Sequence, residues 1–561
     1  MNYKWIIIIF AAIALLIFLV MLRDARRRKI NFIQELRESW GNPSGKEWSA
    51  DHLDYLKEWE EQEKVPFRID DITWNDLEMN KLYTSIDHTY SSCGEEYLYK
   101  ILRRPSFSAE EIKGRQEKYA YAATHEKERM AILRTLSMVG RRNGIVYSDT
   151  IRPLMETSGK STIPYFVLCF LNIASIVLLF FHPVAAVLMI LAVMIINGSV
   201  HAREYQVIQE SMISFSYLLR MIRCGEKICA IGDKDSAFRE EFDEVREITG
   251  KLVRIRKKCV TLAGISGTDA SVSAVFSYFH YFFLLDFIQF YNCLKLVKAA
   301  EKDILRLQEV LGCIDFCISA ASFREMLPYC CEPEFAERGT EISLAEAYHP
   351  LLQDAVANSL ASEKQVLLTG SNASGKSTFL KTVALNQILA QSLGIAAASK
   401  CKVPFLRVMT SMSLKDSFEK GESYYVAEIK AIQRIFCAAE DKTTDILCVL
   451  DEVLRGTNTV ERIAAASAIL SDLAKRGAYV FAATHDRELT GILRNIYENY
   501  HFRECVEQSE LVFDYVLHKG VSTGRNALKL LASFGYDPAL LLQAENEAAH
   551  FEKEGNWTPV C

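Results

Sequence analysis

The sequence lacks an excess of basic residues. Its 561 residues include 65 lysines and arginines against 71 aspartates and glutamates, which gives a formal net charge of −6. A chain of this charge has no global basic surface, so it does not bind nucleic acid through overall charge alone. Local stretches such as residues 251–258 (KLVRIRKK) could form a basic face, but a solvated helix face is the simpler interpretation.

The sequence also lacks an ordered pattern of cysteines. Fifteen are scattered along the chain, without a repeating framework and without a paired CxxC motif near histidines. This distribution argues against a typical structural zinc site. The chain is long and half of it is apolar, so it can bury several cores and is not a small domain held together by disulfides. Reduced thiols in a cytosolic environment are the simplest prediction.

Charge is absent from the first apolar run, residues 5–22, which lies between Lys4 and Arg23. Eighteen helical residues extend about 27 Å, close to the thickness of a hydrocarbon core of about 30 Å, so this run can cross a membrane once. Five basic residues follow within residues 23–29, whereas a cleaved signal peptide carries its positive charge in front. The positive-inside rule then predicts an external N-terminus and a cytoplasmic chain after Arg23.

A second apolar block, residues 163–197, has no acidic or basic residue and is interrupted by His182 and Pro183. It predicts a helical hairpin in the membrane, although its short second arm leaves a re-entrant or a buried soluble hairpin open. A hairpin returns the chain to the cytoplasmic side. The aromatic stretch at residues 272–297 contains polar residues and predicts a core helix rather than a span. Together these segments predict a multi-pass protein of the cell membrane.

The strongest local motif is the segment QVLLTGSNASGKSTFLKTVAL, residues 365–385. An apolar strand, a glycine-rich loop and a helix follow one another, as in a P-loop. Backbone N–H groups of such a loop surround phosphates, Lys376 reaches the β and γ groups, and Ser377 offers its hydroxyl to Mg²⁺. The predicted phosphate-binding residues are Gly370, Ser371, Asn372, Ala373, Ser374, Gly375, Lys376, Ser377 and Thr378.

Two further strand ends complete a nucleotide site. The strand in DILCVLDEV ends at Asp451 and Glu452. Asp451 is predicted to hold Mg²⁺, and Glu452 to orient or deprotonate the attacking water. The strand in AYVFAATHD ends next to His485, whose imidazole can contact the γ-phosphate. Glu452, Lys376 and His485 are therefore the predicted catalytic residues, and ATP and Mg²⁺ the predicted substrate and cofactor.

Apolar strands and helices alternate across residues 365–517, which predicts an α/β P-loop ATPase domain with a mostly parallel sheet and the nucleotide at the carboxyl ends of its strands. A transporter-type ABC ATPase is the nearest alternative. It would carry a stretch like LSGGQ shortly before the Asp-Glu pair, and this sequence has none there.

These motifs resemble those of the MutS family of DNA mismatch-repair ATPases. The loop at residues 369–378, the segment DEVLRGTNT from Asp451, and Ala-Thr-His at residues 483–485 are all similar to the family's motifs. The stretch GESYYVAE resembles the family's serine-bearing signature, which implies that Ser423 reaches the γ-phosphate of a neighbouring subunit. YHPLL resembles a segment near the adenine, which implies contacts from Tyr348, His349, Val356 and Asn358.

The resemblance implies a homodimer with composite ATP sites, and it extends to a helical core at residues 84–117 and 307–325. We therefore expect an anchor at residues 1–30, a linker at 31–70, an all-α MutS-type core or lever domain at 71–340 that contains the hairpin, and a MutS-type ATPase domain at 341–561. The chain departs from the family before residue 70, where the membrane anchor occupies the place of the N-terminal mismatch-recognition domain. Two Phe-x-Glu spellings, at Phe238 and Phe323, fall within helical patterns and are interpreted as chance.

The preferred hypothesis is a membrane-anchored MutS-like ATPase that hydrolyses ATP in a dimer to drive DNA binding or clamping, related to DNA mismatch repair. The alternative is an ATP-driven membrane switch or scaffold that moves the hairpin or a partner without binding DNA. In both, residues 5–22 and 163–197 contact the membrane and the ATPase domain lies on its cytoplasmic side.

Overall fold

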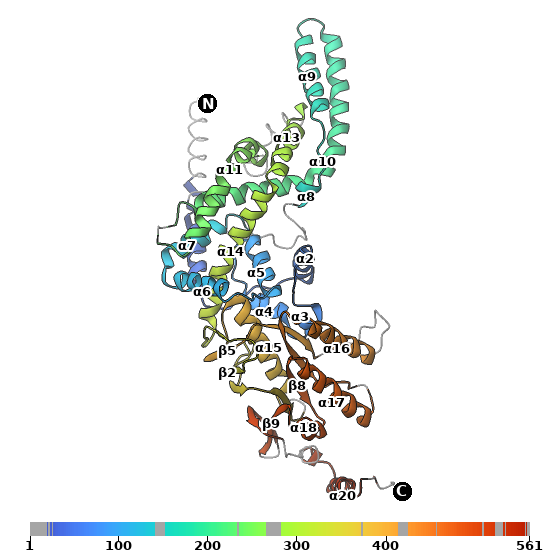
Figure 1. Cartoon of the computed structure of the whole chain (residues 1–561). Helices are drawn as coiled ribbons and strands as arrows, with labels where there is room; N and C mark the ends of the chain where they lie inside the picture. The colour runs from blue at the N-terminus through green and yellow to red at the C-terminus, as the bar shows by residue number, and fades with distance from the viewer. Residues whose placement is uncertain are drawn as a thin grey trace, which may run out of the picture. The chain divides into compact units, whose positions relative to one another are not determined.

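The computed structural model describes residues 19–20, 23–24, 26–140, 152–232, 235–264, 282–371, 374–412, 424–455, 457–507, 510–521, 531–532, 534–555 and 557 (Figure 1). Of the predicted anchor at residues 5–22, only Leu19 and Val20 are described. The predicted first membrane crossing therefore lies outside the described residues.

The chain forms two units, and each of them consists of several segments that alternate along the sequence. The helical unit consists of residues 1–64, 86–100 and 117–326, and the sheet unit of residues 65–85, 101–116 and 327–561. The sequence predicted one helical domain from residue 71 to residue 340. The structure instead groups two short early segments, and all residues after Met326, with the sheet unit.

The helical unit is built from long helices and carries the two apolar arms. Its elements are α2 (Ala50–Glu61), α5 (Ser92–Arg103, which ends in the sheet unit), α6 (Ala109–Thr124, which begins there), α7 (Glu126–Leu136), α8 (Arg152–Glu156), α9 (Ile163–Leu178), α10 (Pro183–Ile228), α11 (Arg239–Gly264), α13 (Leu285–Ala299) and α14 (Glu301–Met326).

A buried carboxylate on α14 holds the start of α5 in place. Asp315 on α14 is fully buried and accepts backbone hydrogen bonds from Tyr90 (3.0 Å) and Ser91 (2.7 Å). These bonds pair two backbone N–H groups that lie just before α5, and they replace the hydrogen bonds to water that the carboxylate loses on burial. Gly94 is required beside it, because a Cβ there would lie 2.4 Å from the Asp315 carboxylate.

The two apolar arms form a hairpin. Figure 1 shows α9 and α10 side by side, and residues 179–182 form the turn between them, next to the break that the sequence predicted at His182 and Pro183. Pro183 is the first residue of α10, a position that tolerates proline because its missing N–H would have no helical partner. Asn172 and Asn197 are both buried, and their amides donate to the carbonyl of Phe282 (2.8 and 2.7 Å). The hairpin is thereby tied to the segment that leads into α13.

The second arm is longer than the sequence suggested. α10 continues through the predicted end at residue 197 to Ile228. Within the described part of the chain, one helical segment, Pro183–Glu204, is long and apolar enough to cross a membrane. Its apolar side chains are mostly exposed, with Val184 at 78% and Ile195 at 72%. A core helix of a soluble protein passes the same length and composition test but is mostly buried, so the exposure is the informative observation.

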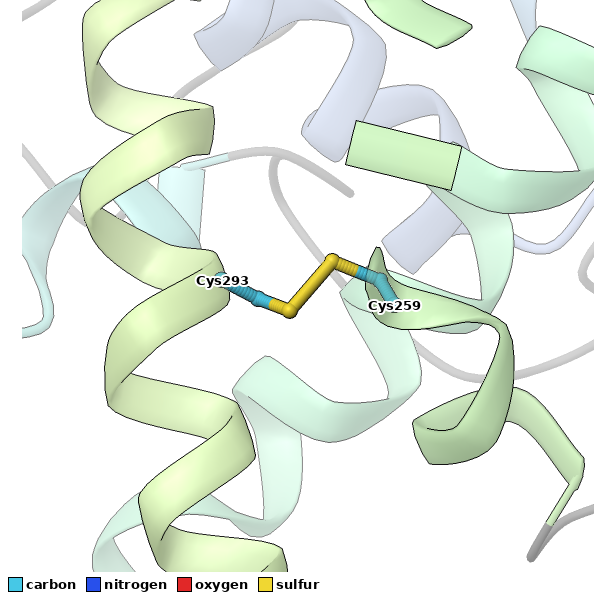
Figure 2. Close-up of a disulfide and its surroundings, with 2 residues drawn as sticks. All are labelled: Cys259 and Cys293. Atoms are coloured by element: carbon cyan, nitrogen blue, oxygen red, sulfur yellow. A yellow bond between two sulfur atoms is a disulfide. The ribbon is translucent and has the colours of Figure 1, made fainter. Parts of the chain in front are cut away.

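Cysteine pairing differs from the prediction of reduced thiols. Cys259 on α11 and Cys293 on α13 form a disulfide with a Cα–Cα distance of 6.2 Å (Figure 2). Both side chains are buried. The prediction is therefore wrong for this pair, because the fold places side by side two cysteines that are 34 residues apart in the sequence and belong to no spacing motif.

Removing this disulfide is expected to destabilise the helical unit. The cross-link closes a loop of 34 residues, for which the chain-entropy account gives about 4 kcal/mol. Cys293→Ser should therefore lower the denaturant midpoint of the helical unit, as measured by circular dichroism in detergent. Cys437→Ser, which changes an exposed free cysteine, is the matched control. Equal midpoints for the wild type and Cys293→Ser, with no cross-linked peptide in non-reducing mass spectrometry, would contradict the assignment.

The aromatic stretch and the Phe-x-Glu spellings lie in packed helices wherever they are described. Residues 265–281 are outside the described part, while Phe287, Phe290 and Tyr291 of α13 are buried as expected for a core helix. Phe238 and Phe323 are 1% and 0% exposed. Neither ring is available to stack on a base, which agrees with their interpretation as chance matches.

The sheet unit contains two sheets. The elements after α14 are β1 (Glu334–Phe335), β2 (Ile342–Ala347), β3 (Asn358–Ser362), β4 (Gln365–Thr369), α15 (Lys376–Leu393), β5 (Lys400–Val403), β6 (Leu406–Ser411), α16 (Tyr424–Glu440), β7 (Asp445–Asp451), α17 (Thr459–Lys475), β8 (Tyr479–Thr484), α18 (Glu488–Ile492), β9 (Tyr497–Glu507), β10 (Glu510–Lys519) and α20 (Pro538–Glu554). The larger sheet has the order β10-β9-β4-β8-β7-β6. Its strands from β9 to β6 are parallel and β10 is antiparallel at the edge, so the sheet is mostly parallel, as predicted. The smaller sheet, β1-β5-β2-β3, was not predicted.

Polar contacts hold the two early segments on the sheet unit. In α3 (Asp71–Asp76), the buried Asp76 accepts from the Thr410 hydroxyl (2.6 Å) and the Met412 N–H (3.0 Å) at the end of β6. α4 (Met79–Ile86) follows it. Arg115 donates to the carbonyl of Ser392 (2.6 Å) at the end of α15. These contacts attach the two early segments to the carboxyl ends of β6 and α15.

Candidate nucleotide-binding site

Backbone conformation explains the glycines of the P-loop. Gly370 directly follows β4 and has a φ of 147°, and Gly375 precedes α15 with a φ of 105°. Both values lie in the region that side chains rarely adopt. A Cβ at Gly370 would also lie 2.9 Å from the Ser374 hydroxyl. Glycine therefore lets the chain turn tightly from the strand into the helix, with the N-terminus of α15 facing the loop.

Lys376 lies where it can reach phosphate oxygens. It is the first residue of α15, and its ammonium donates to the carbonyls of Gly370 (2.8 Å) and Ser371 (2.7 Å). The side chain is 4% exposed. A buried cation held above the loop, together with the positive end of the helix dipole, makes this an anion-binding position.

The two predicted magnesium residues are brought together. The Ser377 hydroxyl donates to Asp451 Oδ2 (2.5 Å), although 74 residues separate them. Asp451 Oδ1 is buried and has no hydrogen-bond partner among the described residues. Burial raises the pKa of Asp451, and the hydrogen bond from Ser377 partly offsets this. A buried carboxylate oxygen without a donor, beside a hydroxyl, fits a hard divalent cation such as Mg²⁺.

Glu452 is oriented by two neighbours. Its carboxylate accepts from His485 Nε2 at 2.7 Å and forms an ion pair with Arg455. Burial disfavours the charged form, but the hydrogen bonds from His485 and Arg455 outweigh it and lower the pKa of Glu452 to about 2. The backbone at Glu452 has a φ of 56°, an uncommon value for a residue with a side chain. His485 was predicted to contact the γ-phosphate; in the structure its partner is Glu452.

These groups surround one cavity of about 470 Å³ in the sheet unit. Its predicted lining residues are His349, Val356, Asn358, Ser371, Ser374, Gly375, Lys376, Ser377, Thr378 and Glu452. A cavity of this size can hold most of a nucleotide. Gly370, Asp451 and His485 do not line the cavity, but each contacts a residue that does, namely Lys376, Ser377 and Glu452 respectively. Asn372, Ala373 and Ser423 lie outside the described residues.

Three of the four predicted adenine residues have different environments. His349 lines the cavity, and burial lowers its pKa to about 4, so it is neutral at pH 7. The Asn358 side chain bonds the backbone of β10, donating to the Tyr515 carbonyl (3.0 Å) and accepting from the Leu517 N–H (2.7 Å). The Tyr348 hydroxyl donates to the carbonyl of Tyr329 (2.6 Å), and the ring does not line the cavity. Tyr348 is therefore a packing residue in this structure.

Several lining residues were missed by the sequence analysis, namely Leu352, Phe379, Thr382, Arg455, Phe502 and Tyr515. Phe502 and Tyr515 come from the β9–β10 pair, and β10 is irregular between Phe513 and Leu517. This irregularity, with a φ of 53° at Tyr515, lets Tyr515 face Gly375. The pairing of β9 with β10 brings the rings of Phe502 and Tyr515 to the cavity, and no local sequence motif predicts this position.

Comparison with known proteins agrees with the geometry. Residues 366–552 match a family model described as MutS domain V. The DNA mismatch repair protein MutS of Thermotoga petrophila is 34% identical over 209 residues, which are 36% of this chain and 26% of that protein. MutS of Natronomonas pharaonis is 28% identical over 272 residues, 46% of this chain and 31% of that protein. The human MutS protein homolog 4 is 30% identical over 260 residues, 43% and 27% respectively.

The matched region contains the P-loop from Gly370, the Asp451–Glu452 pair and His485. The predicted P-loop ATPase fold is thus confirmed for residues 366–552. The alignments cover only 26–31% of the length of these MutS relatives.

Proposed function

We propose that the chain is a membrane-anchored ATPase that hydrolyses ATP with Mg²⁺ in a homodimer and uses the energy to bind or clamp DNA. The observation that carries the proposal is the meeting of Lys376, the Ser377–Asp451 pair and the Glu452–His485 pair around one cavity. All of them lie within residues 366–552, which match a family model described as MutS domain V.

The chain's own residues provide three actions on ATP. The P-loop N–H groups, the α15 N-terminus and Lys376 bind and orient the phosphates. The hydrogen bonds from His485 and Arg455 lower the pKa of Glu452 to about 2, which makes its carboxylate a weak proton acceptor, so it acts by orienting the attacking water more than by holding a proton. His485 keeps the Glu452 carboxylate in place through a 2.7 Å contact.

Ser377 and Asp451 would hold Mg²⁺. No group of three or more His, Cys, Asp or Glu side chains suited to a metal occurs among the described residues, so phosphate oxygens and water would complete the coordination. Bound there, Mg²⁺ would supply charge compensation on the β and γ phosphates.

Two parts of the proposal, the homodimer and the DNA ligand, rest on similarity to other proteins. A signature serine that completes the neighbouring site would make a monomer incomplete, and Ser423 stands at the matching position. The relatives are named DNA mismatch repair proteins, which supports DNA as the ligand. Mismatch recognition itself is not part of the proposal, because the rings of Phe238 and Phe323 are buried.

The hairpin supports the membrane part of the proposal. The hairpin exposes large apolar side chains, such as Phe180 (86%) in the turn and Leu188 (64%) and Ile195 (72%) on α10. An apolar surface of this kind is stable in lipid or under another protein. Basic residues within 23–29 would keep the ATPase on the cytoplasmic side. The cytosol is reducing and Cys259 is buried. The fraction of Cys259 that is alkylated when cells are lysed directly into denaturant with the reagent therefore reports on the compartment of the helical unit.

Charges on the hairpin are expected to release the protein from lipid. In a variant that begins at residue 31, Phe180→Glu, Leu188→Glu and Ile195→Glu together should abolish co-flotation with liposomes, because each charge in the membrane costs about 3 kcal/mol. The matched control places glutamates at Leu305, Val460 and Leu542, which are exposed apolar residues outside the hairpin. Flotation of both triple variants alike would contradict membrane insertion of the hairpin.

One observation favours an alternative function. α10 runs without interruption from the apolar arm to Ile228, where it packs within the helical unit. Such a continuous helix could transmit motion between the hairpin and the rest of the unit. The alternative is therefore an ATP-driven membrane switch that moves the hairpin or a partner without DNA.

DNA binding separates the two functions. The full-length protein in detergent is titrated with fluorescent perfect, mispaired and branched duplexes, with and without ATP, at several salt concentrations. The DNA hypothesis predicts an affinity that changes with ATP and falls with salt, since phosphate contacts release counterions. Lys376→Ala is the control and should remove the ATP effect. No binding to any duplex, together with recovery of a membrane partner that responds to Glu452→Ala, would favour the switch.

A further inference from the structure

A second glutamate lies buried behind the catalytic loop. Glu428 is on α16, and its side chain is 4% exposed. Its Oε1 accepts the backbone N–H of Leu454 at 2.5 Å, while Oε2 is buried and has no hydrogen-bond partner among the described residues. Burial raises the pKa of Glu428, and hydrogen bonds from the N–H groups of Leu454 and Arg455 oppose this. Burying a carboxyl group costs free energy when only one of its two oxygens accepts a hydrogen bond, which is unfavourable for a group with a purely structural role.

The loop that Glu428 contacts has an unusual backbone. Glu452 has a φ of 56° and Leu454 a φ of 61°. Each such residue with a side chain costs about 1–2 kcal/mol relative to an ordinary conformation. Two of them within three positions persist only if neighbouring contacts stabilise the turn. Glu428 provides one contact, and the hydrogen bond from the Glu452 N–H to the Ala483 carbonyl (2.9 Å) provides another.

The same loop controls the catalytic carboxylate. Arg455 follows Leu454 directly and forms an ion pair with Glu452. Glu452 and Arg455 both line the nucleotide cavity, whereas Glu428 does not touch it. A shift of the Leu454 backbone would move Arg455 and with it the carboxylate that orients water. Displacement of a catalytic group by about 1 Å can reduce a rate by about a hundredfold.

We propose that Glu428 is a positioning residue for ATP hydrolysis, which holds the Leu454 N–H so that Arg455 and Glu452 keep their orientation toward the cavity. This role rests on the proposed ATPase activity, but neither the P-loop motif nor the match to MutS domain V assigns it. Glu428 acts through the loop and does not contact the reacting atoms.

Two substitutions of similar size separate this role from simple packing. Glu428→Met fills the space without an oxygen, while Glu428→Gln keeps an acceptor for the Leu454 N–H. We expect kcat of Glu428→Met to fall about tenfold or more and that of Glu428→Gln to stay within about threefold of the wild type. The dissociation constant of a fluorescent ATP analogue should change by less than about twofold in both, because the P-loop is untouched.

A control and a double variant complete the test. Glu440→Met changes an exposed glutamate at the other end of α16 and should leave kcat unchanged. Arg455→Ala combined with Glu428→Met should be no slower than the slower single variant, since both act on Glu452. Wild-type kcat in Glu428→Met would overturn the proposal, as would equal losses of kcat, nucleotide affinity and thermal stability in the Met and Gln variants. If the wild type itself hydrolyses no ATP, the proposed function fails first, which keeps the two failures distinguishable.

Discussion

Lys376→Ala is expected to abolish ATP hydrolysis and to weaken nucleotide binding strongly. The Lys376 ammonium lies within 2.8 Å of two loop carbonyls and is 4% exposed, so its charge acts on the phosphates with little screening by water. Removal of one such charged donor from a site of this kind reduces a rate by at least about a hundredfold. Phosphate release by the purified full-length protein, measured with excess Mg²⁺, gives the rate.

A lysine elsewhere in the sheet unit serves as the control. Lys402 on β5 is about half exposed and pairs with Glu334 on the surface, so Lys402→Ala should retain wild-type turnover. The melting temperatures of both variants should remain close to that of the wild type. Turnover by Lys376→Ala within a few-fold of the wild type would show that the cavity at the P-loop is not the catalytic site.

Glu452→Ala is expected to separate binding from hydrolysis. Its carboxylate faces the cavity beside His485, whereas Lys376 and the loop N–H groups that bind phosphates are left intact. Turnover should fall by about a hundredfold to ten-thousandfold, the range for loss of a general base or water-orienting group, while radiolabelled ATP stays bound and uncleaved on a filter. Lys376→Ala, by contrast, should lose both properties.

A surface glutamate tests whether the Glu452 effect is specific. Glu334→Ala removes an exposed carboxylate of the same unit and should leave turnover unchanged. If Glu452→Ala hydrolyses ATP at the wild-type rate, Glu452 is not the residue that orients water. If it no longer binds ATP, the residue instead has a structural role in the cavity.

The predicted phosphate and metal residues could be found from sequence because each lies at a strand end within a local motif. Gly370 follows β4, Asp451 ends β7 and His485 follows β8, and parallel pairing brings these ends to one edge of the sheet. Local spacing alone therefore placed Ser377 and Asp451 in one site, where the structure finds them in contact.

Other parts of the site depend on long-range packing. Tyr515 reaches the P-loop only because β10 pairs antiparallel with β9 and is irregular there. Glu428 meets Leu454 because α16 packs beside β7, a contact across 26 residues. Tyr515 lies in no motif, and the stretch GESYYVAE, which ends at Glu428, does not indicate that this residue meets Leu454.

The boundaries between the two units also depend on long-range packing. Residues 71–85 and 101–116 were assigned to the helical core domain because residues 84–117 resemble the start of that core in the MutS family, and residues 65–70 were assigned to the linker. Asp76 nevertheless accepts from the Met412 N–H just after β6, and Arg115 donates to the Ser392 carbonyl of α15, so both belong to the sheet unit. Helical periodicity predicts the type of an element but not the partner against which it packs.

The coupling of ATP hydrolysis to DNA is most directly tested by the steady-state ATPase rate of the full-length protein, measured with and without a saturating concentration of duplex DNA at low salt. We predict that DNA changes the rate several-fold in the wild type, and that Lys376→Ala shows no turnover under either condition. A wild-type rate that stays the same with perfect, mispaired and branched DNA would contradict the proposal that this ATPase acts on DNA.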